Sequence, residues 1–168
     1  MNRPVDPLTV EAQVCLALSA AARSLVAFYR PLLEPLGLTH PQYMAMLALW
    51  EHGRLSLKDL AGMLHLDPGT LSPLVKRLET MGLVTRERDP DDERVLAIDL
   101  TDAGRRLRAS AVPVPLAMVE GLGLDEEQLR RIREAADLVI AACTAATQRG
   151  ADVAAGRAVA VAAAAAAR

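Results

Sequence analysis

Hydroxyl and basic side chains gather on one short segment of this chain, residues 67–82. Asp67 is a good helix N-cap, Pro68 suits the first helical position, and Gly82 is a natural stop. Between them a buried stripe is predicted from apolar residues at helical spacing: Leu71, Leu74, Val75 and Leu78. Off that stripe lie the side chains that can donate hydrogen bonds or carry charge, namely Thr70, Ser72, Lys76 and Arg77. Such a set can contact the base edges and phosphates of double-stranded DNA.

A second helix is predicted just upstream, because Ser56-Leu57-Lys58-Asp59 has the form of a capping box and opens a segment that runs to Leu64. Two short helices joined by a tight turn, the second with polar groups outward, are the layout of a helix-turn-helix. The same spacing also fits a plain packing unit of two helices, in which Lys76 is a solvated surface charge.

Two predicted strands follow, over residues 83–88 and 94–100, with a polar turn at residues 89–93. A helix-turn-helix followed by such a ribbon is a winged helix. Arg86, Arg88 and Arg94 lie on the ribbon; Arg94 is the candidate for minor-groove insertion and Arg86 for phosphate contact. The other interpretation is an ordinary hairpin, with Arg94 as a structural partner of a nearby acid such as Asp92 or Glu93.

The charge of the chain gives this interpretation no general support. The formal net charge is −2, and residues 67–94 hold five Lys or Arg against seven Asp or Glu. DNA binding therefore depends on where the Lys and Arg side chains lie, not on how many there are. Only four aromatic residues occur in 168, which argues against single-strand binding by base stacking.

Long helices are predicted on both sides of the winged module. One runs from about Thr9 to Leu33, with an apolar stripe that includes Val14, Leu18 and Leu25, and another covers about residues 40–51. A helix from Thr101 is interrupted at Pro113 and Pro115, and a last one covers about residues 125–148. These helices carry more apolar surface than one winged domain can cover, which predicts a two-fold dimer.

The expected fold is therefore mainly α with a small β wing, a winged helix-turn-helix flanked by long dimerisation helices. The expected organisation is an N-terminal arm (1–8), N-terminal helices for dimerisation and sensing (9–52), the DNA-binding module (53–100), C-terminal dimerisation helices (101–150) and an alanine-rich tail (151–168). The tail has helical propensity but no clear amphipathic face, so we expect it to be disordered or fraying.

Composition excludes several other classes of protein. The first residues have no apolar secretory segment and the tail lacks large apolar residues, so we expect a cytoplasmic protein without a membrane span. Two cysteines, Cys15 and Cys143, are no disulfide scaffold. His52 and His65 have no metal-like spacing with other ligands, so we expect no metal and no cofactor.

Cys15 and Tyr29 are the remaining residues with redox or acid–base chemistry on the first helix. They lie fourteen residues apart, about 21 Å along a straight helix, so a contact between them requires a second chain. From the residues alone, Cys15 is an inert core cysteine and Tyr29 a packing residue with its hydroxyl in water.

Several separate motifs, in order and spacing, resemble the MarR family of winged-helix regulators. The wing shows Asp92-Glu93-Arg94, followed by Leu100-Thr101-Asp102-Ala103-Gly104. Within the family the chain resembles the organic-hydroperoxide (OhrR) branch over about residues 10–148. The matching stretches are Gln13-Val14-Cys15, Tyr29-Arg30-Pro31-Leu32-Leu33, His40-Pro41-Gln42-Tyr43, Leu49-Trp50-Glu51-His52 and residues 66–74.

The resemblance implies a dimeric repressor whose Cys15 is oxidised by organic hydroperoxides, after which the protein leaves its operator. In the branch two tyrosine hydroxyls hold the thiolate; Tyr29 matches one, and His40 stands at the position of the other. An imidazole there can donate the same hydrogen bond or, as a cation, lower the thiol pKa.

Some members of the branch resolve the sulfenic acid with a second cysteine. Cys143 is the candidate here, but it lies later in the chain than expected, which slightly favours a buried structural cysteine and a low-molecular-weight thiol as the resolving partner.

Three other functions remain open on sequence grounds. A regulator of the same fold released by a phenolic or other anionic ligand would leave Cys15 structural. A thiol peroxidase built on Cys15 lacks any other supporting motif, so we expect no enzyme. A protein-interaction module with a degenerate winged helix would show no salt-dependent DNA binding.

Overall fold

The computed structural model describes residues 13–88 and 94–166, with side chains as far as Gly150. The expected N-terminal arm, the expected helix start near Thr9 and the wing turn at residues 89–93 lie outside the described residues. The chain divides into two compact units, residues 1–121 and residues 122–168, which we describe separately.

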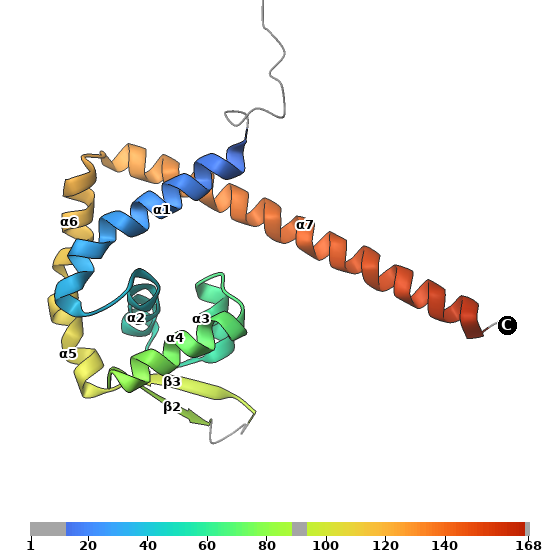
Figure 1. Cartoon of the computed structure of the whole chain (residues 1–168), viewed down its shortest axis with the longest axis horizontal. Helices are drawn as coiled ribbons and strands as arrows, with labels where there is room; N and C mark the ends of the chain where they lie inside the picture. The colour runs from blue at the N-terminus through green and yellow to red at the C-terminus, as the bar shows by residue number, and fades with distance from the viewer. Residues whose placement is uncertain (1–12, 89–93, 167–168) are drawn as a thin grey trace, which may run out of the picture. The chain divides into compact units, whose positions relative to one another are not determined.

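The first unit combines helices with a small winged module (Figure 1). Its flanking helices are α1 (Val14–Leu33), the 3-10 turn η2 (Glu34–Leu36), α2 (His40–His52), α5 (Asp102–Ala111) and α6 (Pro113–Leu122). The winged module contains β1 (Leu55–Ser56), α3 (Leu57–Met63), α4 (Pro68–Thr80), β2 (Val84–Arg88) and β3 (Leu96–Leu100). The predicted class, mainly α with a small β wing on a winged helix-turn-helix, is confirmed.

The two helices of the helix-turn-helix begin at the predicted caps. The Ser56 hydroxyl accepts a hydrogen bond from the Asp59 amide at 3.0 Å, and Asp67 Oδ1 accepts one from the Thr70 amide at 2.8 Å. Each cap satisfies an amide that has no partner inside its own helix.

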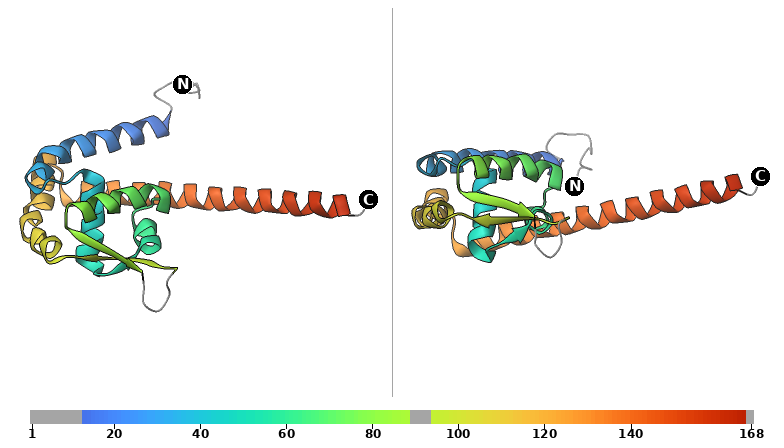
Figure 2. Two further views of the ribbon diagram at one scale, coloured as in Figure 1. Left: turned by 60° about the horizontal axis from the view of Figure 1, so that its bottom comes forward. Right: turned by 90° about the horizontal axis from the view of Figure 1, so that it is seen from below.

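The sheet has three antiparallel strands in the order β1-β3-β2. β2 and β3 form the predicted ribbon, with Arg86 opposite Ile98 (Figure 2). β1 was not predicted, because two residues are too short to show any alternation. It pairs Leu55 with Ile98 and so ties the start of α3 to the ribbon.

The core of this unit lies between α2, the helix-turn-helix and the inner face of the sheet. The fully buried side chains include Leu33, Tyr43, Leu49, Leu60 and Ile98. The predicted stripe of α4 is confirmed at Leu71, Val75 and Leu78, which are buried, whereas Leu74 is only half-buried.

The Leu100–Gly104 motif fastens α5 to the winged module. The Thr101 hydroxyl donates to the Gly82 carbonyl at 2.6 Å and accepts from the Gly104 amide at 3.0 Å. The Trp50 indole donates to the Gly104 carbonyl at 2.9 Å. A Cβ on Gly104 would collide with the Leu83 carbonyl oxygen, so this position requires glycine.

α5 and α6 are separate helices, as Pro113 predicted, since α5 ends at Ala111 and α6 begins at Pro113. The interruption predicted at Pro115 is wrong, because Pro115 lies in the first turn of α6, where its missing N–H removes no hydrogen bond within the helix. Gly121 near the end of α6 lies against α1, where a Cβ would approach Phe28 Cζ to 2.6 Å. Among the described residues no single helix is both long and apolar enough to cross a membrane. Taken together, residues 102–122 and 126–150 have the required length and composition, but the two segments are sharply bent relative to each other.

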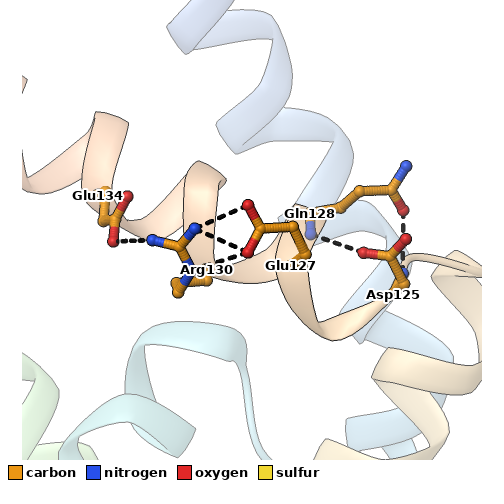
Figure 3. Close-up of polar contacts among 5 residues, drawn as sticks. All are labelled: Asp125, Glu127, Gln128, Arg130 and Glu134. Atoms are coloured by element: carbon orange, nitrogen blue, oxygen red, sulfur yellow. Dashed lines mark hydrogen bonds and ion pairs between the residues drawn. The ribbon is translucent and has the colours of Figure 1, made fainter.

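The second unit is dominated by one helix, α7 (Glu126–Ala166). It begins with a reciprocal cap, in which Asp125 Oδ1 accepts from the Gln128 amide at 2.7 Å and Gln128 Oε1 accepts from the Asp125 amide at 2.9 Å (Figure 3). Arg130 bridges Glu127 and Glu134 along the surface (Figure 3). The helix is longer than the predicted end near residue 148 and continues through the tail that we expected to be disordered. Alanine has the highest helix propensity of all residues, which accounts for the continuation.

Candidate functional site

The polar face of α4 has the exposure that contact with DNA requires. Thr70, Lys76 and Arg77 are exposed and Ser72 is half-buried, while the core stripe lies on the opposite face of the helix. Thr70 is also part of the cap, because its hydroxyl donates to Asp67 Oδ2 at 2.5 Å. That hydrogen bond, together with the Thr70 amide, lowers the pKa of Asp67 below its ordinary value.

A groove of about 250 Å³ lies between α4, the second helix of the helix-turn-helix, and the start of α2. One wall is formed by Thr39, Pro41 and Gln42, and the other by the α4 residues Thr70, Pro73, Leu74 and Arg77. These four α4 residues follow i, i+3, i+4, i+7 spacing and so share one helix face. The half-burial of Leu74 follows from its place in this groove.

The wing arginines lie in two different environments. Arg86 shares the inner face of β2 with the buried Val84, and its Nε lies 2.8 Å from Glu79 Oε2 on α4. Arg86 therefore links the wing to α4. The sequence predicted only a phosphate contact for Arg86 and not this structural role. Arg94 is exposed just before β3, while Asp92 and Glu93, its suggested partners, lie outside the described residues.

The candidate sensing residues fall at three places in the first unit. Cys15 is exposed in the first turn of α1, Tyr29 is buried near the end of α1, and His40 is the first residue of α2. The structure brings Tyr29 and His40 together, with ring centroids 5.0 Å apart in an edge-on arrangement. It does not bring Cys15 to them, because the helix between Cys15 and Tyr29 is continuous.

Burial sets the protonation of this aromatic cluster. It raises the pKa of Tyr29, and it raises the pKa of Tyr43, whose ring lies 6.0 Å from that of Tyr29; the charge of Tyr29 adds to this second shift. It lowers the pKa of His40 below its ordinary value. At neutral pH the cluster therefore presents two phenol hydroxyls and a neutral imidazole.

Two hollows border these residues. One of about 550 Å³ lies beside His40 and is lined on the α1 side by Val26 and Arg30. Another, of about 470 Å³, lies between α2 and the α5–α6 segment, and its lining includes Tyr43, Trp50, Glu51 and Arg108.

Sequence reasoning missed two polar residues that the structure brings forward. Glu79 is the partner of Arg86. Strand alternation with Val84 places Arg86 on the inner face of β2, but it does not identify the α4 residue that Arg86 meets there. Gln42 is the one buried polar side chain among the residues that the structure describes. Its signal was the Thr39–Gln42 capping spacing, which identifies a cap but not burial.

Cys143 is exposed on α7, whereas we expected a buried small residue. The reason is that no residue at positions 122–150 is buried in the single chain, so a residue on α7 has little to be buried against. Its carbonyl accepts a hydrogen bond from the Thr147 hydroxyl at 3.0 Å. Among the described residues no group of three or more His, Cys, Asp or Glu side chains is placed to hold a metal.

Comparison with known proteins gives consistent results. The MarR family model matches residues 38–96. The chain is 42% identical over 133 residues to the organic hydroperoxide resistance transcriptional regulator of Bacillus subtilis, covering 77% of this chain and 90% of the relative.

Solved structures agree with this sequence match. Reduced AbfR bound to DNA, a protein of Staphylococcus epidermidis, superposes with a TM-score of 0.66 at 30% identity, covering 78% of this chain and 91% of that one. BpsR of Bordetella bronchiseptica, whose DNA binding is regulated by 6-hydroxynicotinic acid, superposes with a TM-score of 0.71 at 26% identity. The match covers 80% of this chain and 97% of that one.

The winged module, the exposed polar face of α4 and these matches together identify a DNA-binding transcriptional regulator rather than an enzyme. The chain belongs to the MarR family, and within it resembles the organic-hydroperoxide branch.

Proposed function

We propose that this chain forms a homodimeric repressor that senses organic hydroperoxides by oxidation of Cys15 and then releases its operator. The observation that carries the proposal is the separation of Cys15 and Tyr29 at opposite ends of one continuous helix, with Tyr29 held in an aromatic cluster. Such a cluster can serve Cys15 only if Cys15 comes from a second chain.

The exposed surface of α1 supports a partner chain. Residues 13–27 are all exposed, and they include the apolar side chains of Val14, Leu16, Leu18, Leu25 and Val26. A helix with this much exposed apolar surface is stabilised by burying it against another copy. An antiparallel approach of two α1 helices would bring Cys15 of one chain toward Tyr29 and His40 of the other, beside the 550 Å³ hollow.

In this arrangement His40 acts as a neutral hydrogen-bond donor. Burial lowers its pKa, and its position at the first turn of α2 also disfavours a cation, because the N-terminus of a helix carries partial positive charge. Tyr29 and His40 would then supply the two donors to the Cys15 thiolate.

The chemical step is a two-electron oxidation. The thiolate sulfur attacks the terminal oxygen of the hydroperoxide, the O–O bond breaks, and the alkoxide leaves and takes up a proton as the alcohol. Cys15 becomes a sulfenic acid, which a second thiol converts to a disulfide with loss of water. The candidates for that second thiol are Cys143, which is exposed on α7, and a low-molecular-weight thiol.

The test is binding of the reduced protein to DNA upstream of its own gene, before and after one equivalent of cumene hydroperoxide. Cys15→Ser is the matched control, because it keeps size and polarity and removes the nucleophilic sulfur. We expect loss of binding in the wild type only. Binding that survives oxidation in the wild type would overturn the proposal.

On the DNA side we propose that Thr70, Ser72, Lys76 and Arg77 meet the major groove and that Arg94 reaches the minor groove. Arg86 holds the wing against α4 through Glu79 and reaches phosphates only with its remaining donors.

A second candidate function is release by an aromatic anion. The 470 Å³ hollow favours an aromatic ligand, since Tyr43, Leu47 and Trp50 give an apolar wall. Arg108 can pair with the anionic group of such a ligand, while the carboxylate of Glu51, which lines the same hollow, opposes it. BpsR, similar in fold, is regulated by 6-hydroxynicotinic acid. This function predicts that 6-hydroxynicotinic acid releases DNA equally from the wild type and from Cys15→Ser; no release from either would exclude it for this ligand.

A further inference from the structure

We propose that Gln42 is a positioning residue that couples the start of α2, where His40 meets Tyr29, to the C-terminal end of the reading helix α4. The inference rests on the proposed function for its biological meaning, but not for its test. It is carried by the contacts of one buried amide.

The hydrogen bonds of Gln42 fix its orientation. Its Oε1 accepts from the Thr39 amide at 2.8 Å and from the Thr39 hydroxyl at 2.9 Å. Because the backbone N–H of Thr39 can only donate, the amide oxygen of Gln42 must face it, and the NH₂ group must face the other way. There Nε2 donates to the thioether sulfur of Met81 at 3.7 Å.

These contacts join two functional ends. Gln42 lies two residues after His40 and directly before Tyr43, so it belongs to the same helical turn as the aromatic cluster. Met81 is the C-cap of α4 and follows the turn that carries Arg77. The two residues are 39 positions apart in the sequence and lie on either side of the contact between α2 and α4.

The weakness of the Met81 sulfur as an acceptor allows the Gln42–Met81 contact to break when the protein changes conformation. A thioether is a weak acceptor, whereas the two bonds from Thr39 are short and keep Gln42 attached to α2. A shift of the α2 N-terminus would therefore carry Gln42 with it and break the contact with Met81 first. The open groove beside this contact leaves space for such a shift.

Two substitutions remove the contact without removing the cap. Gln42→Glu keeps an oxygen acceptor for Thr39, since Glu is itself a favoured residue at this cap position, but it removes the donor to Met81. Met81→Leu keeps the volume and removes the acceptor. Met63→Leu on α3 is the matched control, because Met63 and Met81 are similarly exposed, at 45% and 42%.

The first measurement is operator affinity of the reduced protein in a double-mutant cycle of His40→Ala with Met81→Leu. If the α2 start acts on α4 through this contact, His40→Ala weakens binding about three- to tenfold in the wild type but clearly less in the Met81→Leu background. In the Met63→Leu background the effect of His40→Ala stays as in the wild type. Fully additive effects with Met81→Leu would overturn the inference.

The second measurement is the ratio of operator affinities before and after one equivalent of cumene hydroperoxide. We expect Gln42→Glu and Met81→Leu each to reduce this ratio, and the double variant to reduce it no further. A merely structural role would lower the melting temperature and leave the ratio unchanged, which would contradict the inference. If the wild type itself shows no change on oxidation, the proposed function fails, and the cycle with His40→Ala alone decides the inference.

Discussion

At the scale of single residues, His40 is the clearest departure from the family pattern, and its surroundings give it a distinct protonation behaviour. The side chain lies against Tyr29 and is partly withdrawn from water, which lowers its pKa below the ordinary value of 6.5. A tyrosine at this position would stay protonated at every physiological pH, whereas His40 changes charge under mild acid. Acid therefore tests its environment directly.

We expect the stability of the protein to fall as the pH is lowered through the ordinary pKa of histidine. Below about pH 6.5 the unfolded chain binds a proton at His40 that the folded chain does not, so the free energy of unfolding decreases with decreasing pH. Urea unfolding between about pH 7 and pH 5 should show a shallower dependence in His40→Gln than in the wild type. His52→Gln, at the exposed end of the same helix, is the control. Equal slopes in His40→Gln and the wild type would contradict the assigned environment.

Within the Leu100–Gly104 motif, Gly104 is the residue whose identity has the clearest physical explanation. Ordinarily Gly→Ala inside a helix stabilises by up to about 1 kcal/mol. Here the new methyl would meet the backbone carbonyl of Leu83, which Thr101 holds in place, so Gly104→Ala should destabilise by roughly 1–3 kcal/mol. Gly62→Ala on α3 has open space around it and should be neutral or stabilising in the same thermal unfolding experiment. A stable Gly104→Ala protein would show that α5 can move away from β2.

At the scale of elements, the sequence predicted most of the winged module because its signals are local. The caps at Ser56 and Asp67 and the apolar period of α4 need only neighbouring residues. β1, the Gln42–Met81 contact and the Glu79–Arg86 pair could not be predicted in this way, since each depends on how distant segments meet. α7 exceeded its predicted end because alanine propensity alone sustains a helix.

The two wing arginines should separate stability from DNA binding. Arg86→Ala removes a half-buried ion pair with Glu79 and should lower the free energy of unfolding by about 0.5–1 kcal/mol. Arg94→Ala, at an exposed position before β3, should weaken operator binding without unfolding the dimer. Thermal unfolding and DNA titration of both variants are the measurement. Weakened binding by Arg86→Ala at unchanged stability would reverse the two roles.

At the scale of the whole molecule, the proposed sensing chemistry requires a second chain. The apolar residues of α1 and those of α7, such as Ile132 and Leu138, remain exposed in the single chain. The proposed sensing site needs both the Cys15 thiol and the hydrogen-bond donors of the aromatic cluster, and the single chain does not bring them together. The proposed dimer completes two such sites at once, each with Cys15 from one chain and Tyr29 from the other.

A heterodimer distinguishes this arrangement from any site within one chain. Tyr29→Phe removes a hydrogen bond to the thiolate and should slow oxidation of Cys15 by about tenfold or more in the homodimer. When a Cys15→Ser chain pairs with a Tyr29→Phe chain, the single remaining Cys15 lies on the Tyr29→Phe chain. In a shared site that Cys15 faces the intact Tyr29 of its partner and should react with cumene hydroperoxide at the wild-type rate. In a site confined to one chain it would react as slowly as in the Tyr29→Phe homodimer, so the rate of sulfenic acid formation in this heterodimer assigns the tyrosine to one chain or the other.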